Sequence, residues 1–251
     1  MLSQTSIEDA ALPDASPLLR VPFVLLCLLM TGLFVGAVYA SALRAGSPAV
    51  AARRRALVAT AASALWLGAT AAAASMGRLS FAAPPTMFGV LAMTLALALG
   101  IGLSPAGRQL AVGLPLAALV GFQGYRIGVE LLLHRAYTEG LMPVQMSYSG
   151  RNFDILTGVT AVAMAAWLAR GHPSPRAVLA WNTLGLGLLV NIVAVALLSA
   201  PTPLRVFMNE PANIWVTRAP WVWLPAVLVL LGLLGHVLVY RRLLLDHRAA
   251  R

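Results

Sequence analysis

The chain has 251 residues, of which 60% are hydrophobic and 10% are charged. Soluble domains carry about 25% charged residues, so this composition excludes an ordinary soluble protein. The formal net charge of +10 comes from 18 arginines without a lysine. Arginines of this kind set the orientation of a membrane protein, so we expect a lipid bilayer and no nucleic acid as partner. The missing lysine also excludes a retinal Schiff base.

Seven apolar stretches follow one another along the chain, each close to the roughly 20 residues that a helix needs to span lipid. They are Val21–Leu43, Ala56–Met76, Pro85–Leu103, Leu110–His134, Phe153–Ala169, Ala177–Ser199 and Pro220–Leu244. Open sheets cannot span hydrocarbon, and these stretches are too long for the strands of a barrel. The sequence therefore predicts an all-α bundle of seven transmembrane helices.

The arginines are distributed unevenly between the two sides of this bundle. One side carries Arg44, Arg53, Arg54, Arg55, Arg108, Arg170, Arg176, Arg241, Arg242, Arg248 and Arg251. The other side carries Arg20, Arg78, Arg135, Arg151, Arg205 and Arg218. The positive-inside rule then predicts an external N-terminus and a cytoplasmic C-terminus.

Three parts of the chain follow from this topology. Residues 1–19 contain acidic residues and no basic one, whereas a cleavable signal peptide begins with a positive charge. They are predicted to form a flexible external tail. Residues 20–246 are predicted as a single membrane domain and residues 247–251 as a short cytoplasmic tail.

The predicted helix Leu110–His134 holds the densest group of ionisable residues. Arg126, Glu130 and His134 recur every four residues and therefore share one helix face. An ionisable group inside lipid needs a partner or a wet cavity, so this face is the leading candidate site. We expect Arg126 and Glu130 to neutralise each other, in a ligand site or as a purely structural bridge. The helical rise from Leu110 places Arg126 roughly 24 Å from the cytoplasmic end, near the external side.

Further polar residues are predicted at the same external level. Asp154 begins the fifth helix, where a carboxylate is favoured by the helix dipole and would cap the helix. Asn191 is expected to face Glu130 or Arg126 across the bundle. The complete set of candidate ligand-binding residues is Arg126, Glu130, His134, Arg151, Asn152, Asp154, Asn191 and Glu210.

The cytoplasmic half of the bundle offers fewer polar groups. Asn182 and His236 each lie about a third of the way in from the cytoplasm by helical rise, and the two could pair with each other. Few polar groups at this depth argue against a channel-like passage.

The second half of the chain carries several motifs: Phe122-Gln123-Gly124-Tyr125-Arg126 with Glu130 and His134, Gly140-Leu141-Met142-Pro143-x-Gln145-Met146, Gly150-Arg151-Asn152-Phe153-Asp154, Phe207-Met208-Asn209-Glu210-Pro211 and Trp223-Leu224-Pro225. Together these motifs resemble a family of small bacterial polytopic integral membrane proteins of uncharacterised activity. The resemblance implies a multi-pass protein of the bacterial inner membrane and carries no mechanism with it.

Three classes of function stay open. In the first and favoured class, the protein binds or transports a small-molecule or lipid-like ligand in an externally facing cavity. Glu130 would then respond to protons or cations, and Arg126 or Arg151 would hold an anionic part of the ligand.

The second class is an intramembrane enzyme for a lipid-like substrate, with Glu130 or Asp154 as general base and His134 as acid or metal ligand. Arg151 and Asn152 would stabilise developing negative charge. The third class is a structural subunit of a membrane complex. The sequence identifies neither a metal nor a cofactor, and it does not distinguish a homo-oligomer from a larger complex.

Overall fold

The computed structural model describes residues 12–82, 85–172 and 174–249, and this part of the chain contains helices without a β-strand. Six of its helices are long and apolar enough to cross a membrane. They are α2 (Pro17–Arg44), α3 (Ala49–Ser75), α4 (Thr86–Leu103), the α6–α7 helix (Leu116–Thr138), α9 (Pro175–Leu198) and the η4–α10 helix (Leu224–Ala249). The predicted helical membrane bundle is therefore confirmed, and the chain is a multi-pass membrane protein. The remaining apolar helix, α8 (Ile155–Ala169), has only 15 residues.

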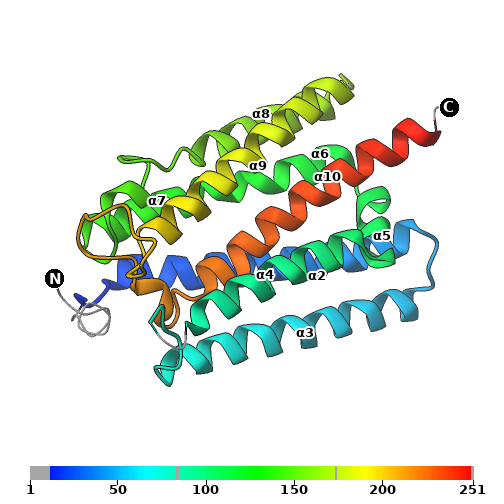
Figure 1. Ribbon diagram of the computed structural model, residues 1–251. Coiled ribbons are helices and arrows are strands. Elements are labelled where there is room, and N and C mark those ends of the chain that lie inside the picture. The colour runs from blue at the N-terminus through cyan, green and yellow to red at the C-terminus, as the bar shows by residue number, and fades with distance from the viewer. Residues whose placement is uncertain (1–11, 83–84, 173, 250–251) are drawn as a thin grey trace.

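The central helix of the bundle is α10 (Leu230–Ala249). It packs against α4, α9, the short helix α5 (Pro105–Gly113) and α6 (Leu116–Gly121), and Figure 1 shows it running between α4 and α9. Two thirds of the most apolar part of the η4–α10 helix is buried, against a third or less in each of the other five long helices. Those outer helices leave large apolar side chains exposed, as lipid-facing helices do.

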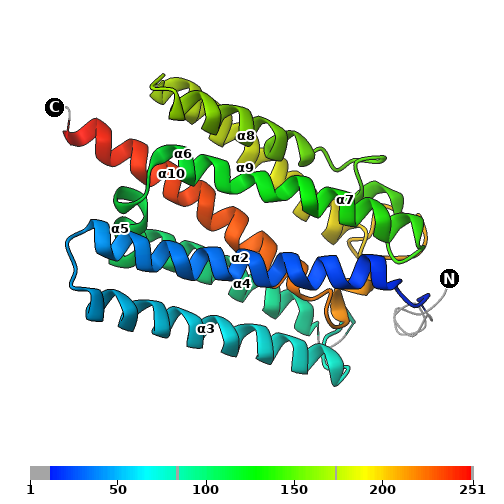
Figure 2. The ribbon, with the colours of Figure 1, turned by 180° about the vertical axis from the view of Figure 1, so that it is seen from behind.

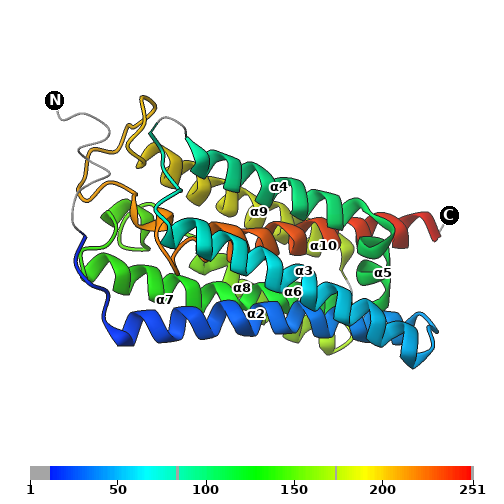
Figure 3. The same ribbon diagram turned by 90° about the horizontal axis from the view of Figure 1, so that it is seen from below.

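The two ends of the bundle differ in composition. The start of α2 lies at one end and the end of α10 at the other (Figure 3). We call the first the loop end, because the long connections 139–154 and 199–223 lie there. We call the second the arginine-rich end, because it carries Arg53–Arg55, α5 and the C-terminal turns of α10.

The fourth predicted segment is divided, and its transmembrane part begins later than expected. Ser104 caps α5 by accepting a hydrogen bond from the Gly107 amide at 3.2 Å. Leu114 then takes an extended conformation, as residues before a proline do, and the next helix starts after Pro115. Arg126 consequently lies about 15 Å from the start of its helix, near the middle of that helix, instead of the roughly 24 Å that the predicted start at Leu110 gave.

Both predicted tails are shorter than expected, because the first and last helices extend into them. The first helix begins at Pro17 and the last ends at Ala249, so both boundaries of the predicted membrane domain fall inside helices. Residues 1–11 of the predicted N-terminal tail lie outside the described residues.

The last helix opens with a π-helical segment, η4 (Leu224–Val229). Side chains of other elements satisfy its carbonyl groups: Trp66 donates to Ala226 at 2.8 Å and Tyr125 to Leu228 at 2.5 Å.

The start of α2 is fastened to the end of α7 (Tyr125–Thr138). Glu139, just beyond α7, accepts hydrogen bonds from the hydroxyl and the backbone amide of Ser16, and it pairs with Arg135. Partial burial alone would raise the pKa of the Glu139 carboxyl, but the hydrogen bonds from Ser16 and the interactions with Arg135 outweigh it. They hold this pKa below its ordinary value.

At low pH, the hydrogen bonds between Ser16 and Glu139 are expected to break. Because the folded-state pKa of Glu139 is the lower one, the contact stabilises the protein above the ordinary value of 4.5 and is lost as the pH falls through the folded value. We expect a spin label at Asp14→Cys to become more mobile below that pH, and to be equally mobile at neutral pH in a Glu139→Gln variant. The native Cys27 is buried, so it does not compete for the label. Equal label mobility with and without Glu139 would contradict the role of this contact.

Candidate ligand-binding site

Arg126 is almost completely buried in the middle of the bundle and binds partners from three elements. Its guanidinium forms an ion pair with Asp154 at the start of α8. Its Nε donates to Gln123 Oε1 at 3.0 Å, and its Nη2 lies 3.2 Å from His236 Nε2 on α10. The expected pairing of Arg126 with Glu130 is wrong, because the carboxylate that neutralises Arg126 comes from another helix.

The pairing predicted between Asn182 and His236 is present and joins Arg126. Asn182 Nδ2 donates to the backbone oxygen of His236 at 3.1 Å, and His236 Nδ1 lies 2.8 Å from Asn182 Oδ1. A guanidinium can only donate, so Nε2 of His236 must accept and its proton must lie on Nδ1, which donates to Asn182. The predicted separation of this pair from the external cluster is wrong, since both histidine and arginine lie at mid-depth. We call Gln123, Arg126, Asp154, Asn182 and His236 the Arg126 network.

Asp154 stands at the N-cap position of α8, yet its side chain makes no capping hydrogen bond. Its Oδ1 instead receives Arg126 and the Thr157 hydroxyl, the latter at 3.0 Å. The backbone amide of Asp154 donates to Asn152 Oδ1 at 3.1 Å. The expected capping role is thus replaced by neutralisation of a buried cation.

Glu130 lies one helical turn from Arg126 and is also buried, but it has a different partner. Its Oε1 accepts a hydrogen bond from Asn152 Nδ2 at 2.7 Å. Its Oε2 is buried and has no hydrogen-bond partner among the described residues. A buried acceptor left in this state costs about 1–3 kcal/mol, so the position of Oε2 requires an explanation.

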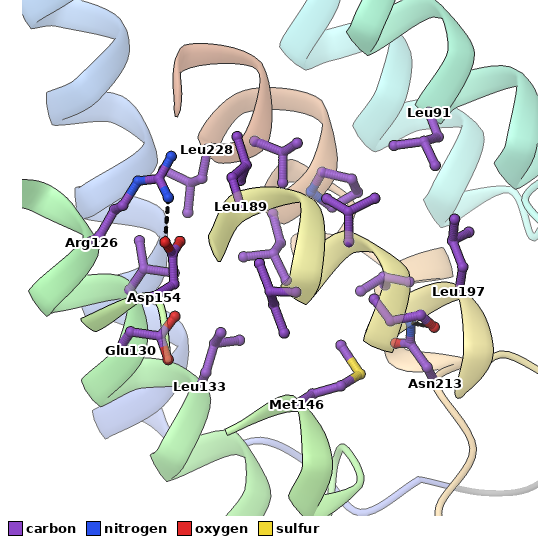
Figure 4. Close-up of a pocket in the computed structure, with 18 of the residues that line it drawn as sticks. Leu91, Arg126, Glu130, Leu133, Met146, Asp154, Leu189, Leu197, Asn213 and Leu228 are labelled. Atoms are coloured by element: carbon purple, nitrogen blue, oxygen red, sulfur yellow. Dashed lines mark hydrogen bonds and ion pairs between the residues drawn. The ribbon is translucent and has the colours of Figure 1, made fainter. Parts of the chain in front are cut away.

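The explanation lies in a cavity of about 100 Å³ beside Glu130 (Figure 4). Arg126, Asp154, Glu130 and Asn213 contribute polar groups to its wall, and the rest of the wall is largely apolar. Asn213 Nδ2 donates to the backbone of Ala196 at 2.9 Å, whereas its Oδ1 is buried without a partner in the described chain. Figure 4 shows Glu130 and Asn213 on opposite sides of the apolar side chains. Two unused acceptors therefore line one apolar cavity.

The cavity lies in the half of the bundle nearer the loop end. Apolar side chains from three elements form its wall: Met87, Phe88 and Leu91 at the start of α4, Leu189, Ile192, Val193, Ala196 and Leu197 in the second half of α9, and part of η4. α4 and α9 each pack against α10. Leu91, Ile192 and Val193 are only half-buried, so the cavity reaches the outer surface of the bundle between α4 and α9. A ligand could enter there from lipid.

Two of the predicted site residues are directed elsewhere. His134 Nδ1 lies 3.2 Å from the Ser149 hydroxyl, and its ring stacks on Tyr148 with centroids 4.3 Å apart. The Arg151 guanidinium lies 5.1 Å from the centre of the Phe207 ring. The described contacts of His134 and Arg151 are therefore with residues other than Glu130, whereas Asn152, which the enzyme hypothesis also names, bonds Glu130.

The last two predicted residues lie in or beside the surface connections. Asn191 donates to the backbone oxygen of Arg151 at 2.8 Å, so the expectation that it faces Glu130 or Arg126 is wrong. Glu210 is largely exposed and pairs with Arg205 at 2.9 Å. Among the described residues, no group of three or more histidine, cysteine, aspartate or glutamate side chains is placed to hold a metal ion.

Three glycines make room for the Arg126 network. A methyl group on Gly185 would lie 2.8 Å from His236 Cε1, and one on Gly232 would lie 2.8 Å from Arg126 Nη2. One on Gly235 would lie 2.5 Å from Gln123 Nε2. The backbones of α9 and α10 thus approach the polar side chains more closely than any other residue would allow.

Comparison of the chain with protein-family models, with curated proteins and with solved structures gives no match.

The Arg126–Asp154 pair is expected to carry much more stability than a surface pair. Asp154→Asn leaves a buried guanidinium without its counter-charge and should lower the free energy of unfolding by about 3–5 kcal/mol. Glu210→Gln removes an exposed partner and should cost at most about 1 kcal/mol. Denaturant unfolding of both variants in mixed micelles tests this difference, and equal losses would contradict it.

Two glycines on α9 provide a matched test of close packing around the network. Gly185→Ala should destabilise the protein by about 1–3 kcal/mol, because the new methyl group meets His236 and Thr157. Gly187 has nothing within 4 Å of the equivalent position, so Gly187→Ala should change stability by less than about 1 kcal/mol, in the stabilising direction. The same unfolding measurement applies, and a neutral Gly185→Ala variant would show that α9 is not held against His236.

Proposed function

We propose that the protein binds a small amphiphilic ligand in the cavity beside Glu130, through an ammonium or hydroxyl group of the ligand. The single observation that carries this proposal is the buried Oε2 of Glu130, which lines the cavity without a hydrogen-bond partner in the described chain. The apolar remainder of the wall suits the hydrocarbon part of such a ligand.

The chemistry of the wall supports a ligand that donates hydrogen bonds. The two unused polar atoms are oxygens: Asn213 Oδ1 accepts hydrogen bonds, and Glu130 Oε2 accepts them when its carboxyl is ionised. Arg126 is engaged by Asp154, Gln123 and His236, which leaves it poorly suited to hold an anionic ligand group. A donor on the ligand would remove the cost of the unpaired acceptor and so would bind with more than the energy of an ordinary exposed hydrogen bond.

The proposal includes a topology for the membrane domain. The two termini of the described chain lie at opposite ends of the bundle (Figure 1), which supports an odd number of crossings. We infer that α8 is the seventh, beside the six longer helices. The positive-inside rule supports a cytoplasmic arginine-rich end, so that the cavity lies in the external half of a bacterial inner membrane.

A series of six-carbon probes distinguishes the ligand classes. Hexylammonium and hexanol should bind the protein in nanodiscs, and hexanoate should not, as measured by saturation-transfer NMR against empty nanodiscs. In Glu130→Gln, Asn152 keeps the amide oxygen toward its own donor, so the amide nitrogen replaces Oε2 at the cavity. Hexylammonium binding should then weaken at least about tenfold and hexanoate binding should appear.

The matched control is Glu210→Gln, which makes the same substitution at an exposed site. It should bind the three probes like the wild-type protein. If Glu130→Gln binds them like the wild type and unfolds at the same denaturant concentration, the cavity is not a ligand site, and a structural role in a complex becomes the better hypothesis.

A further inference from the structure

A second, larger cavity lies on the other side of α10. Its volume is about 670 Å³, within the range of about 300–1,000 Å³ that small-molecule sites occupy. α3 forms one wall and α4 and α5 form the opposite wall, while Leu230 and Leu231 of α10 contribute to its floor. α3 packs mainly against α2, and Figure 2 shows the two helices side by side, with α3 at the edge of the bundle. The side of α3 that faces α4 is therefore left unfilled.

The wall of this cavity is apolar and opens toward the lipid. Phe34 and Val38 of α2 and Trp66 of α3 line it together with the α10 leucines. Val58 lines it as well, yet 62% of this side chain is exposed. The cavity is thus an open groove along α3 that hydrocarbon chains can enter from the bilayer.

Two arginines line the groove near its arginine-rich end. Arg55 Nη1 donates to Gln109 Oε1 on α5 at 2.6 Å and to the Ser47 hydroxyl at 3.3 Å. A guanidinium has five N–H donors, so Arg55 retains donors for an anion. Arg54 also lines the groove and forms no ion pair with the described residues. Among the described residues, Asp246 is the one acidic residue at this end, and it is already paired with Arg242.

The depth of the two arginines matches that of a lipid headgroup. From Arg54 to the end of α3 at Ser75 the helix rises about 32 Å, close to the roughly 30 Å thickness of the hydrocarbon core. Arg54 and Arg55 therefore lie where the acyl chains of one leaflet meet its phosphates.

We propose that this groove binds an anionic phospholipid, with its phosphate on Arg54 and Arg55 and an acyl chain between α3 and α10. The charge of the arginines selects the acidic headgroup, and planar guanidinium groups match phosphate oxygens in pairs. A second copy of this chain would have to offer acidic residues to the same arginines, and the described acidic residues lie mostly toward the loop end or are buried. The site is separate from the cavity beside Glu130 and does not depend on its ligand.

Native mass spectrometry of the purified, delipidated full-length protein tests the proposal. The probes are dioleoyl phosphatidylglycerol, dioleoyl phosphatidylcholine and the short-chain dihexanoyl phosphatidylglycerol. We expect the first dioleoyl phosphatidylglycerol to bind about tenfold more tightly than either of the others. The double variant Arg54→Gln/Arg55→Gln should lose this preference for the anionic lipid. The control Arg44→Gln/Arg53→Gln removes the same charge from exposed positions at the same end outside the groove and should keep the preference.

A second variant tests the groove without changing charge. Ala62 lines the groove on α3, so Ala62→Trp should fill it and weaken dioleoyl phosphatidylglycerol binding about tenfold while the arginines are intact. If both double variants lose the preference for the anionic lipid equally, the lipid is attracted to the basic surface in general, and the proposed site is wrong. Equal binding of the short-chain lipid, or a lipid-independent dimer in which Ala62→Trp changes assembly instead of lipid binding, would also overturn it.

Discussion

A buried guanidinium in the centre of the bundle is the constraint on which the other features depend. Burying a charge in a low-dielectric interior is costly unless the charge is paired and its hydrogen bonds are made. Arg126 meets this requirement with groups from η1 (Phe122–Gly124), the start of α8 and the middle of α10. It therefore fixes three elements against one another at mid-depth. Because Asp154 supplies the counter-charge, Glu130 has no cation of its own, and its carboxyl is left directed at the cavity.

Hydropathy predicted the helices well and their arrangement poorly. A helix that is apolar on all sides can face lipid or pack inside the bundle equally well, so composition does not reveal which helix is central. α10 is central because its glycines admit side chains of the neighbouring helices, and Gly232 and Gly235 gave no signal that hydropathy reads. The break before Pro115 was a readable local signal. Hydropathy does not register it, because Leu110–Gly113 is as apolar as the helix that follows.

The candidate site was predicted in composition but not in pairing. Arg126, Glu130, Asn152 and Asp154 do come together, since the connection 139–154 returns the chain to the helix that precedes it. A four-residue spacing indicates that two side chains are neighbours on a helix. It does not indicate that they form an ion pair with each other instead of with a third group. Asn213 belongs to a long connection whose path no periodicity describes, so its place in the cavity wall could not be predicted.

The length of α8 has a consequence for the surrounding bilayer. Its 15 residues rise about 22 Å, while the hydrocarbon core is roughly 30 Å thick. With α8 as the proposed seventh crossing, hydrophobic mismatch would thin the leaflets beside this helix, at a cost of a fraction of a kcal/mol per Å. The protein would then prefer thin membranes over thick ones and would sort laterally between them, independently of any ligand.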